Sequence, residues 1–498
     1  SAINNLLANE GVGGCTYNPF GFQPVSAACL AYAGRTDNTT DELTSKNVEL
    51  TVQGPLFTLP GGEAKIALGA DYRQSRFDYQ PDSLFITGDS LAYGSATASS
   101  GSQNAKEVFG ELLLPFLKDR SFAKELSVDL GYRYSKYNTF SGKSTWKADA
   151  SWTVVNGLRF RGGYSFAFRA PSLADLYAGD AVGNESLNGG DPCDILNRGT
   201  SSQLQALCAA QSPAAGSSTY SFAGANVTVP VQTGGNKLLK PETARTWSIG
   251  TVLTPVRGLS LSVDYYDMSI SGAISSLSSG QILASCYGAT ANPTFSVNNP
   301  FCQRVTRDPN SGQITLLASG LFNYSKFKLS GVDAQIDYRL PLDRLGMPER
   351  AGALQIGSIV SYLRKYVVTP SDGTASTNFA GAISDTFVTS DGENLYSHPR
   401  WKANTYLSYL NGPFVGTLRW RYIGHMANLD DATQKVPSVS YFDADLHYKF
   451  SKWLSLSAGM NNIADKKPPF IGTLELRTDA ATYDVVGRTW YLGAKLSF

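Results

Sequence analysis

Long hydrophobic runs, charge and histidine are all scarce in this chain of 498 residues. No apolar run approaches the roughly 18 residues that a transmembrane helix needs. Charged residues make up 17% of the chain and the net charge is +1, so the totals give no electrostatic case for binding nucleic acid or an acidic lipid surface. The three histidines, His398, His425 and His447, show no zinc spacing, and neither a phosphate loop nor a nucleophile–base pair stands out. The sequence therefore predicts a protein that is not an enzyme and that holds no metal or cofactor.

What the chain does have is strict alternation of apolar and polar residues over many segments. In the segment 126–135, one face carries Leu126, Val128, Leu130, Tyr132 and Tyr134, and the other carries Ser127, Asp129, Gly131, Arg133 and Ser135. The pattern recurs over 442–450 and 454–461, and again in the last eight residues, which end on Phe498. Such alternation over about ten residues is typical of a transmembrane β-barrel, whose strands meet lipid on one face only. We therefore predict an all-β chain, an antiparallel barrel in a bacterial outer membrane, with a closing strand that ends at Phe498.

About fifteen alternating segments can be counted, and short connections between them alternate with long ones. They begin near residues 46, 63, 104, 124, 143, 158, 243, 258, 324, 353, 399, 413, 438, 452 and 482. Long connections of such barrels lie outside the cell. This predicts an extracellular loop over 1–45, the C-terminal part of a barrel over 46–498, and long extracellular loops over 169–242, 272–320 and 370–398. Because single-chain bacterial barrels have even strand numbers, an odd count predicts further strands outside this chain.

Five local strings resemble those of TonB-dependent outer-membrane receptors. The clearest is Phe168-Arg169-Ala170-Pro171-Ser172, which continues through Leu173-Ala174-Asp175-Leu176-Tyr177. A second is Gly235-Asn236-Lys237-Leu238-Leu239-Lys240-Pro241-Glu242. The others are Ser330-Gly331-Val332-Asp333, Asn461-Asn462-Ile463-Ala464-Asp465, and the closing strand from Gly487 to Phe498. From the turn chemistry we predict that the first two strings form the exit and re-entry turns of one loop, with a substrate-facing role as the alternative.

The resemblance implies a barrel of about 22 strands whose lumen is filled by an N-terminal plug. This chain would supply about fifteen of those strands, so the plug and the remaining strands are expected elsewhere, on a second chain if the protein is split in a surface loop. A chain shortened at its N-terminus would give the same pattern. The family resemblance also implies a TonB energy complex of the inner membrane as a partner, besides the outer-membrane lipid.

The six cysteines form three neighbouring pairs in loop-like segments rich in small polar residues. The pairs are Cys15 with Cys29, Cys193 with Cys208, and Cys286 with Cys302. Paired cysteines in such segments predict three local disulfides and an oxidising compartment. Six unrelated thiols are the alternative.

Ligand capture is expected in the long outer loops, because loops carry binding function on rigid scaffolds. Candidate stacking residues are Tyr220, Phe222, Tyr287 and Phe295, which could equally pack the loops together. Arg419 and Arg421 belong to a set of inner-face charges that could line a solute path or could simply pair with opposite charges. The loops carry few charges, which favours a neutral, hydroxyl-rich ligand such as an oligosaccharide, with a siderophore next.

The predicted function is TonB-dependent active uptake of a scarce nutrient, a small molecule or an oligomer, across the bacterial outer membrane. A passive outer-membrane pore or a surface-binding scaffold is the alternative. No nucleic-acid partner is expected.

Overall fold

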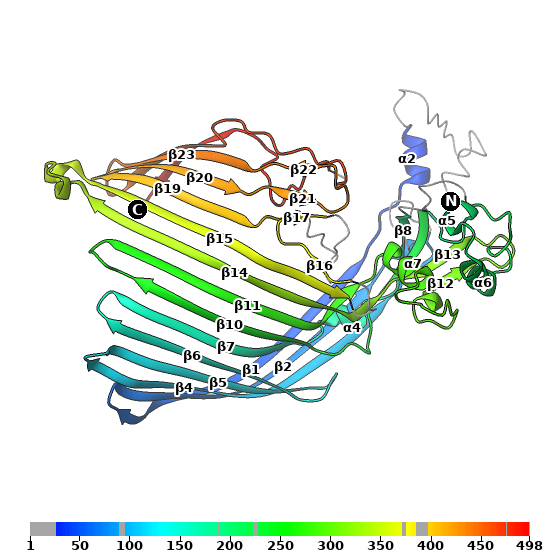
Figure 1. Cartoon of the computed structure of the whole chain (residues 1–498), viewed down its shortest axis with the longest axis horizontal. Helices are drawn as coiled ribbons and strands as arrows, with labels where there is room; N and C mark the ends of the chain where they lie inside the picture. The colour runs from blue at the N-terminus through cyan, green and yellow to red at the C-terminus, as the bar shows by residue number, and fades with distance from the viewer. Residues whose placement is uncertain are drawn as a thin grey trace.

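One large antiparallel sheet dominates the computed structural model, which describes residues 26–88, 95–187, 190–222, 228–370, 375–384, 397–474 and 476–497. Fifteen of its strands follow chain order, each hydrogen-bonded to the next (Figure 1). They are β1 (Thr40–Leu59), β2 (Gly62–Gln80), β4 (Ser99–Arg120), β5 (Ala123–Tyr137), β6 (Lys143–Val155), β7 (Leu158–Arg169), β10 (Glu242–Leu253), β11 (Leu259–Ser276), β14 (Leu321–Pro341), β15 (Ala353–Pro370), β19 (Trp401–Asn411), β20 (Phe414–Ile423), β23 (Val439–Lys449), β24 (Leu454–Asn461) and β25 (Thr489–Leu496). A short sixteenth strand, β16 (Thr377–Asn378), pairs with β15. The structure therefore has the all-β class and the number of large strands that the sequence predicted.

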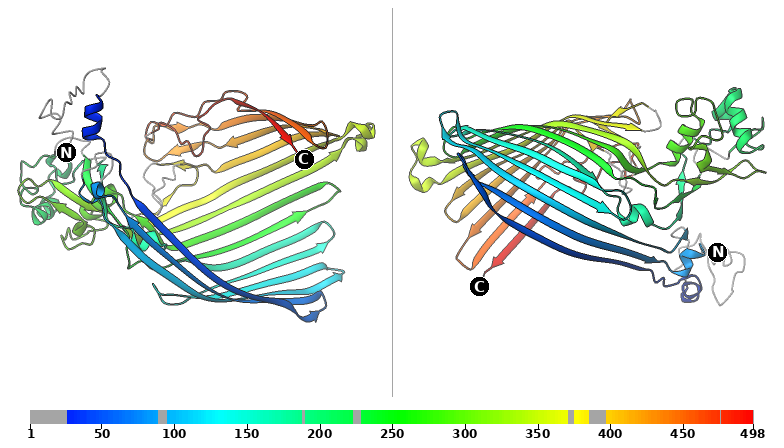
Figure 2. Two further views of the ribbon diagram at one scale, coloured as in Figure 1. Left: turned by 180° about the vertical axis from the view of Figure 1, so that it is seen from behind. Right: turned by 90° about the horizontal axis from the view of Figure 1, so that it is seen from below.

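The sheet twists and curls, and its two kinds of connection lie at opposite ends (Figures 1 and 2). Short turns such as 60–61 and 156–157 join strands at one end, and the long connections gather at the other. Within the described residues the sheet is an open path from β1 to β25 rather than a closed ring. No helix among the described residues is long and apolar enough to cross a membrane.

Two differences from the expected strand bounds have a physical cause. The first strand begins at Thr40 rather than near 46, and its added residues 40–45 are all polar except Leu43 and all exposed except Thr44. The last strand begins at Thr489 rather than near 482, because Asp484 uses its backbone N–H to donate to the Tyr441 hydroxyl instead of joining a ladder. Phe498 lies outside the described residues, so its closing role stays a prediction.

Smaller elements fill the long connections. A five-stranded sheet contains β3 (Ser95–Ala96), β8 (Ala181–Ser186), β9 (Thr228–Thr233), β12 (Val305–Arg307) and β13 (Ile314–Ala318). A four-stranded sheet contains β17 (Ala382–Ile383), β18 (Ser397–His398), β21 (Met426–Asn428) and β22 (Lys435–Val436). The α-helices are α2 (Ala27–Ala33), α3 (Ser83–Ile86), α4 (Leu173–Tyr177), α5 (Ile195–Arg198), α6 (Ser202–Gln211) and α7 (Ser279–Tyr287), and short 3-10 turns are η2 (Cys302–Arg304), η3 (Leu342–Leu345) and η4 (Glu349–Ala351).

The alternation of the sequence sorts side chains to the two faces of the large sheet. Leu446 is 52% exposed on one face, whereas Asp443 on the other face is 6% exposed. Asp443 accepts two hydrogen bonds from Arg421, at 2.7 and 2.9 Å. An exposed apolar face and a paired polar face are the reverse of a water-soluble sandwich, in which the charges would face bulk water.

Aromatic pairs mark two levels on the apolar face. Toward the long connections lie Trp146 with Tyr164, Trp247 with Tyr265, and Tyr362 with Trp401, whose ring centroids are 5.1, 5.1 and 4.6 Å apart. Toward the short turns lie Trp152 with Phe160 and Tyr448 with Phe450, at 5.9 and 4.6 Å. Two aromatic levels flanking an apolar band are the pattern of the membrane interfaces of a β-barrel.

On the polar face, three ionic or hydrogen-bonded pairs cross over a glycine in the strand between them. Lys147 of β6 reaches Glu111 of β4 at 2.6 Å across Gly131. Arg161 of β7 meets Asp264 of β11 across Gly250, and Tyr406 of β19 donates to Asp337 of β14 across Gly357. Strands two apart are separated by roughly 10 Å, so such a pair needs a small residue in the middle strand. The Arg73–Tyr137 hydrogen bond, at 3.2 Å, likewise crosses over Ala105.

Replacing Gly250 with valine is expected to disrupt the Arg161–Asp264 pair. An added Cβ would stand 1.9 Å from Asp264 Oδ1, so the carboxylate must move. We expect a loss of about 1–3 kcal/mol of unfolding free energy, as for overpacked sites. The measurement is the denaturant midpoint of the purified protein in detergent. Gly54→Val in β1 is the matched control because nothing lies within 4 Å of its added Cβ, and equal losses in both variants would contradict the steric explanation.

Candidate functional site

The rim of the sheet at its long-loop end is built from the two clearest sequence strings. Arg169, the last residue of β7, donates to both carboxylate oxygens of Glu242, the first residue of β10, at 2.8 and 3.0 Å. Its third contact is with Asp175 of α4, at 3.1 Å. The chain leaves β7 through Pro171, and Ser172 with Asp175 forms a capping box that starts α4. The charged residues Arg169, Asp175 and Glu242 therefore hold the exit and re-entry turns together.

The rest of the two strings supports the same rim. Phe168 packs edge-on against Tyr137 and Phe140, with centroids 6.2 and 6.0 Å apart. The backbone N–H of Lys240 donates to Asn323 at 2.8 Å, directly before Pro241 and Glu242. Glu242 also accepts the backbone N–H of Ile274 from the next long connection, at 2.6 Å. These contacts favour the turn role that we predicted for Phe168, Arg169, Ala170, Pro171, Ser172, Lys240, Pro241 and Glu242.

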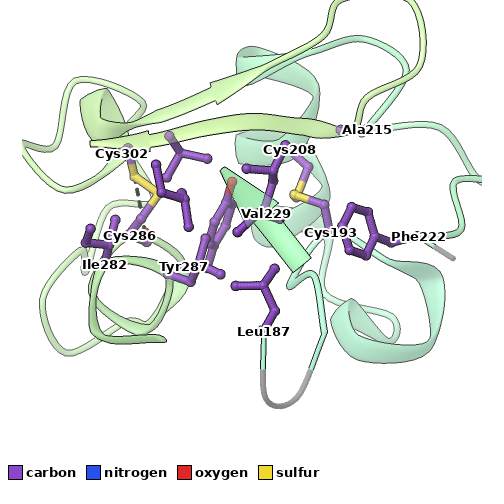
Figure 3. Close-up of a cluster of buried hydrophobic side chains, with 14 of the residues drawn as sticks. Leu187, Cys193, Cys208, Ala215, Phe222, Val229, Ile282, Cys286, Tyr287 and Cys302 are labelled. Atoms are coloured by element: carbon purple, nitrogen blue, oxygen red, sulfur yellow. Dashed lines mark hydrogen bonds between the residues drawn. A yellow bond between two sulfur atoms is a disulfide. The ribbon is translucent and has the colours of Figure 1, made fainter. Parts of the chain in front are cut away.

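Beyond this rim, the first and second long connections fold together into one compact unit. We define the loop domain as α5, α6, α7 and the five-stranded sheet of β3, β8, β9, β12 and β13. Apart from β3, it lies within the described residues 181–187, 190–222, 228–233 and 277–319. Its core includes Leu187, Leu207, Val229, Ile282 and Leu317 (Figure 3). Strands β13 and β9, one from each connection, run parallel and are hydrogen-bonded. The two connections therefore share one sheet and one core.

Two disulfides lie in this core, and both are pairs that the cysteine spacing predicted. Cys193 is bonded to Cys208 within the first connection, and Cys286 is bonded to Cys302 within the second. Tyr287 lies between the two disulfides in Figure 3. Cys29 is buried, but its predicted partner Cys15 lies outside the described residues. The first of the three predicted disulfides therefore stays a prediction.

A fully buried ion pair joins the two connections. Arg307 of β12 donates to both oxygens of Asp191, at 2.6 and 2.7 Å, and both side chains are 0% exposed. The hydroxyls of Tyr220 and Tyr287 complete the network: Tyr220 donates to Asp191 at 2.8 Å, and Tyr287 accepts from Arg307 at 2.8 Å. Tyr287 also donates to Gln211. Burial raises the pKa of Tyr287 to about 12, so it stays protonated and can act as both donor and acceptor.

The aromatic candidates for ligand stacking lie inside the loop domain rather than on its surface. Tyr220, Phe222 and Tyr287 are 5%, 5% and 6% exposed, and Phe295 is partly buried against the same core. Their rings pack the disulfides and the ion pair, so these three buried faces are not available to a sugar ring. The burial of Tyr220, Phe222 and Tyr287 favours the alternative that these residues pack the loops down.

The two arginine candidates lie on the polar face of β20. Arg421 pairs with Asp443 and approaches Asp484 at 3.7 Å, and its guanidinium lies over the Tyr441 ring. Arg419 is exposed and lies opposite Tyr406 and Asp443 in register. Arg421 is therefore tied into a structural network, and Arg419 is the one of the two that faces open space.

Sequence reasoning missed Asp191 and Arg307, the two residues that the loop domain depends on most. The sequence did contain a signal for them. The long loops have few charged residues, so any buried ion pair within them must come from a short list. Asp191 also stands two positions before Cys193, whose backbone N–H donates to it at 2.8 Å. The sequence could not show that its partner would be Arg307, which belongs to another loop.

Comparison with known proteins decides the family. The family model described as TonB dependent receptor-like, beta-barrel matches residues 7–463 of the chain. The chain belongs to the TonB-dependent receptor-like β-barrel family. The large antiparallel sheet of fifteen main strands agrees with the β-barrel of that family.

Solved structures share this fold at low sequence identity. A variant of the ferric enterobactin receptor PfeA from Pseudomonas aeruginosa in complex with enterobactin matches with a TM-score of 0.58 and 17% identity, over 92% of this chain and 55% of the receptor. The siderophore receptor PirA from Acinetobacter baumannii matches at 0.54 and 15%, over 92% and 55%. The ferric-catecholate import receptor Fiu from E. coli K12 matches at 0.51 and 13%, over 93% and 55%. This chain therefore spans about half the length of each of these receptors.

Acid is expected to loosen the loop domain through Asp194. Burial opposes its charged form, but backbone N–H groups of Leu196 and Phe222 donate to it and hold its pKa below the ordinary value. A lowered folded-state pKa stabilises the fold above about pH 4 and loses that contribution as the pH falls through the folded value. Hydrogen exchange of 194–222 should therefore accelerate between pH 5 and pH 3, approximate limits set by that reference value. Asp194→Asn should exchange faster at neutral pH and respond less to acid, and an unchanged acid response would contradict the assignment.

Proposed function

We propose that this chain is the larger part of an energised uptake receptor of the bacterial outer membrane. The family match over residues 7–463 carries the proposal. The loop domain captures the solute outside the cell, and an inner-membrane TonB complex supplies the energy, because the outer membrane has no energy source of its own. The outer-membrane lipid surrounds the apolar face that carries Leu446.

A plug and further strands are part of the proposal. Strands β1 and β25 each have one neighbour within the described sheet. The siderophore receptors with the same fold are matched over only 55% of their own length. Both observations support additional strands and a plug, on the same polypeptide or on a second one.

We propose a ferric siderophore as the first ligand class to test. The similar solved structures are described as siderophore or ferric-catecholate receptors, which supports this order. An oligosaccharide, which the low charge of the loops suggested, becomes the second candidate, since Tyr220, Phe222 and Tyr287 are buried in the loop domain and cannot stack on a sugar ring. The passive-pore alternative has no specific observation in its favour.

The experiment is accumulation of iron-55 delivered as a ferric siderophore to cells that express the full receptor. We expect accumulation in cells with TonB and none after deletion of the tonB gene or dissipation of the proton gradient. Asp191→Leu, which leaves the buried Arg307 without a carboxylate partner, should weaken capture. Accumulation that persists without TonB would contradict energised uptake and indicate a pore. A radiolabelled oligosaccharide taken up in the same TonB-dependent way would keep the mechanism and replace the ligand class.

A further inference from the structure

A cluster of cations lies on the apolar face of the sheet, just beyond the aromatic level next to the long loops. It consists of Arg245 in β10, Lys328 in β14, and Arg364 and Lys365 in β15, all exposed. In register, Arg245 is opposite Ser269, and Ser269 is opposite Lys328. Lys365 is opposite Ser330. Since successive residues of a strand face opposite sides, this register places the cluster on the same face as Trp247, the side that meets lipid.

The cluster is joined to the aromatic level directly. Arg364 occupies the register shift between Gly331 and Ser330 of the neighbouring strand and donates to the Tyr265 hydroxyl at 3.1 Å. Tyr265 is stacked on Trp247, whose centroid is 5.1 Å away. The cations therefore stand at the depth at which the headgroups of the adjoining leaflet begin.

The charges of the cluster have no partner among the described residues. None of the four cations forms an ion pair within 4.0 Å there. On this face of β10, β11, β14 and β15, Asp267 is the single carboxylate of the described chain at this level, and Ser330 beside it is 1% exposed. The Ser330 hydroxyl has no hydrogen-bond partner among the described residues. Four cations surround two serines and the single carboxylate of Asp267, so positive charge is in excess and the site suits a group with several acceptor oxygens and negative charge.

A second group of exposed cations lies at the same distance from the long loops, in β4 and β5. Near the short turns of this hairpin the arrangement differs. Lys106 of β4 and Lys136 of β5 are exposed and directly opposite in register, next to Val108 and Tyr134. Like charges placed opposite each other are destabilising unless an anion lies between them. At the short-turn end of the same hairpin, Lys124 is ion-paired with Asp119 at 3.3 Å.

We propose that Arg245, Lys328, Arg364 and Lys365 bind the phosphate group of a lipid headgroup in the outer leaflet. The overall charge of +1 hides this local excess. Basic clusters beside a membrane-spanning segment attract anionic headgroups, and each cation contributes on the order of 1 kcal/mol. The inference rests on the outer-membrane placement proposed above, but not on uptake, on TonB or on the nature of the transported solute.

The test is lipid binding by the full protein in nanodiscs of phosphatidylcholine. One set contains lipid A and a second contains the same lipid after enzymatic removal of its phosphates. Native mass spectrometry counts the retained lipid, and quenching of tryptophan fluorescence by a labelled lipid gives the affinity. We expect retention of phosphorylated lipid A and little retention of the dephosphorylated form, with no displacement by free inorganic phosphate.

The variant Lys328→Gln with Lys365→Gln should bind phosphorylated lipid about 30-fold more weakly, as the loss of two such cations implies. Lys328→Arg with Lys365→Arg should keep the affinity, and Arg350→Gln with Lys452→Gln at the short turns should not change it. Equal retention of both lipids by the unmodified protein would overturn the proposal even if the glutamine variant failed to fold. Lipid binding without any uptake would contradict the uptake proposal alone.

Discussion

Replacing Arg307 with methionine is expected to destabilise the loop domain by about 3–5 kcal/mol, the cost of leaving one partner of a buried ion pair uncompensated. Asp191 would remain fully buried, held by Tyr220 and the backbone N–H of Cys193 but without a cation. Because Asp191 and Arg307 belong to different long connections, the two connections should separate. Thermolysin digestion of the full receptor at native pH measures the opening free energy of the loop domain.

Two further variants make this expectation specific. Arg304→Met removes a nearby arginine that stacks on Phe322 at 3.9 Å and donates to a backbone carbonyl, but pairs with no described carboxylate. It should cost much less. Asp191→Leu combined with Arg307→Met removes both charges and should recover part of the loss, since a buried pair can often be replaced by apolar residues. A single Arg307 variant as stable as the unmodified receptor would show that the pair is not what joins the connections.

The consequence for the proposed function follows from the same geometry. The barrel strands share no contact with the Arg307 side chain, whose described partners are Asp191, Gln211, Tyr287 and Gly312. The Arg307 variant should therefore still assemble in the membrane while binding its solute more weakly. A higher half-saturating concentration at an unchanged maximal uptake rate is the expected signature.

The large sheet could be predicted from the sequence because its period is local. A two-residue alternation fixes which side chains share a face without any knowledge of distant residues. The segment expected near 243 begins at Glu242, and the one expected near 438 begins at Val439. The predicted start of the first strand was wrong because residues 40–43 are mostly polar and exposed on both faces, so alternation no longer marks the strand there.

The loop domain could not be predicted in the same way because its contacts are not local. The ion pair joins residues 116 positions apart, and the parallel pairing of β13 with β9 joins two different connections. The composition of these segments indicated only that they are connections rich in small polar residues. It could not show that Tyr220 and Tyr287 face inward, since an aromatic ring serves a core and a binding surface equally well.

Loss of the disulfides is expected to weaken each connection separately. In Cys193→Ser with Cys208→Ser, the released loop spans 15 positions, and in Cys286→Ser with Cys302→Ser it spans 16. Closing a loop of this length stabilises a fold by about 3 kcal/mol. Each double variant should therefore open more easily by about that amount, measured by thermolysin digestion of the full receptor and by mass spectrometry of the first fragments.

The position of the first cut separates the two kinds of restraint. Each disulfide closes a loop within its own connection, whereas Arg307 joins one connection to the other. The first cut should fall within 193–208 for the first cysteine variant, around α6, and within 286–302 for the second. In the Arg307 variant both disulfides stay intact, so cuts within these loops should leave fragments joined until a reductant is added. Identical first cuts in all three variants would mean that the loop domain opens in one cooperative step, and that the disulfides and the ion pair stabilise the same unit.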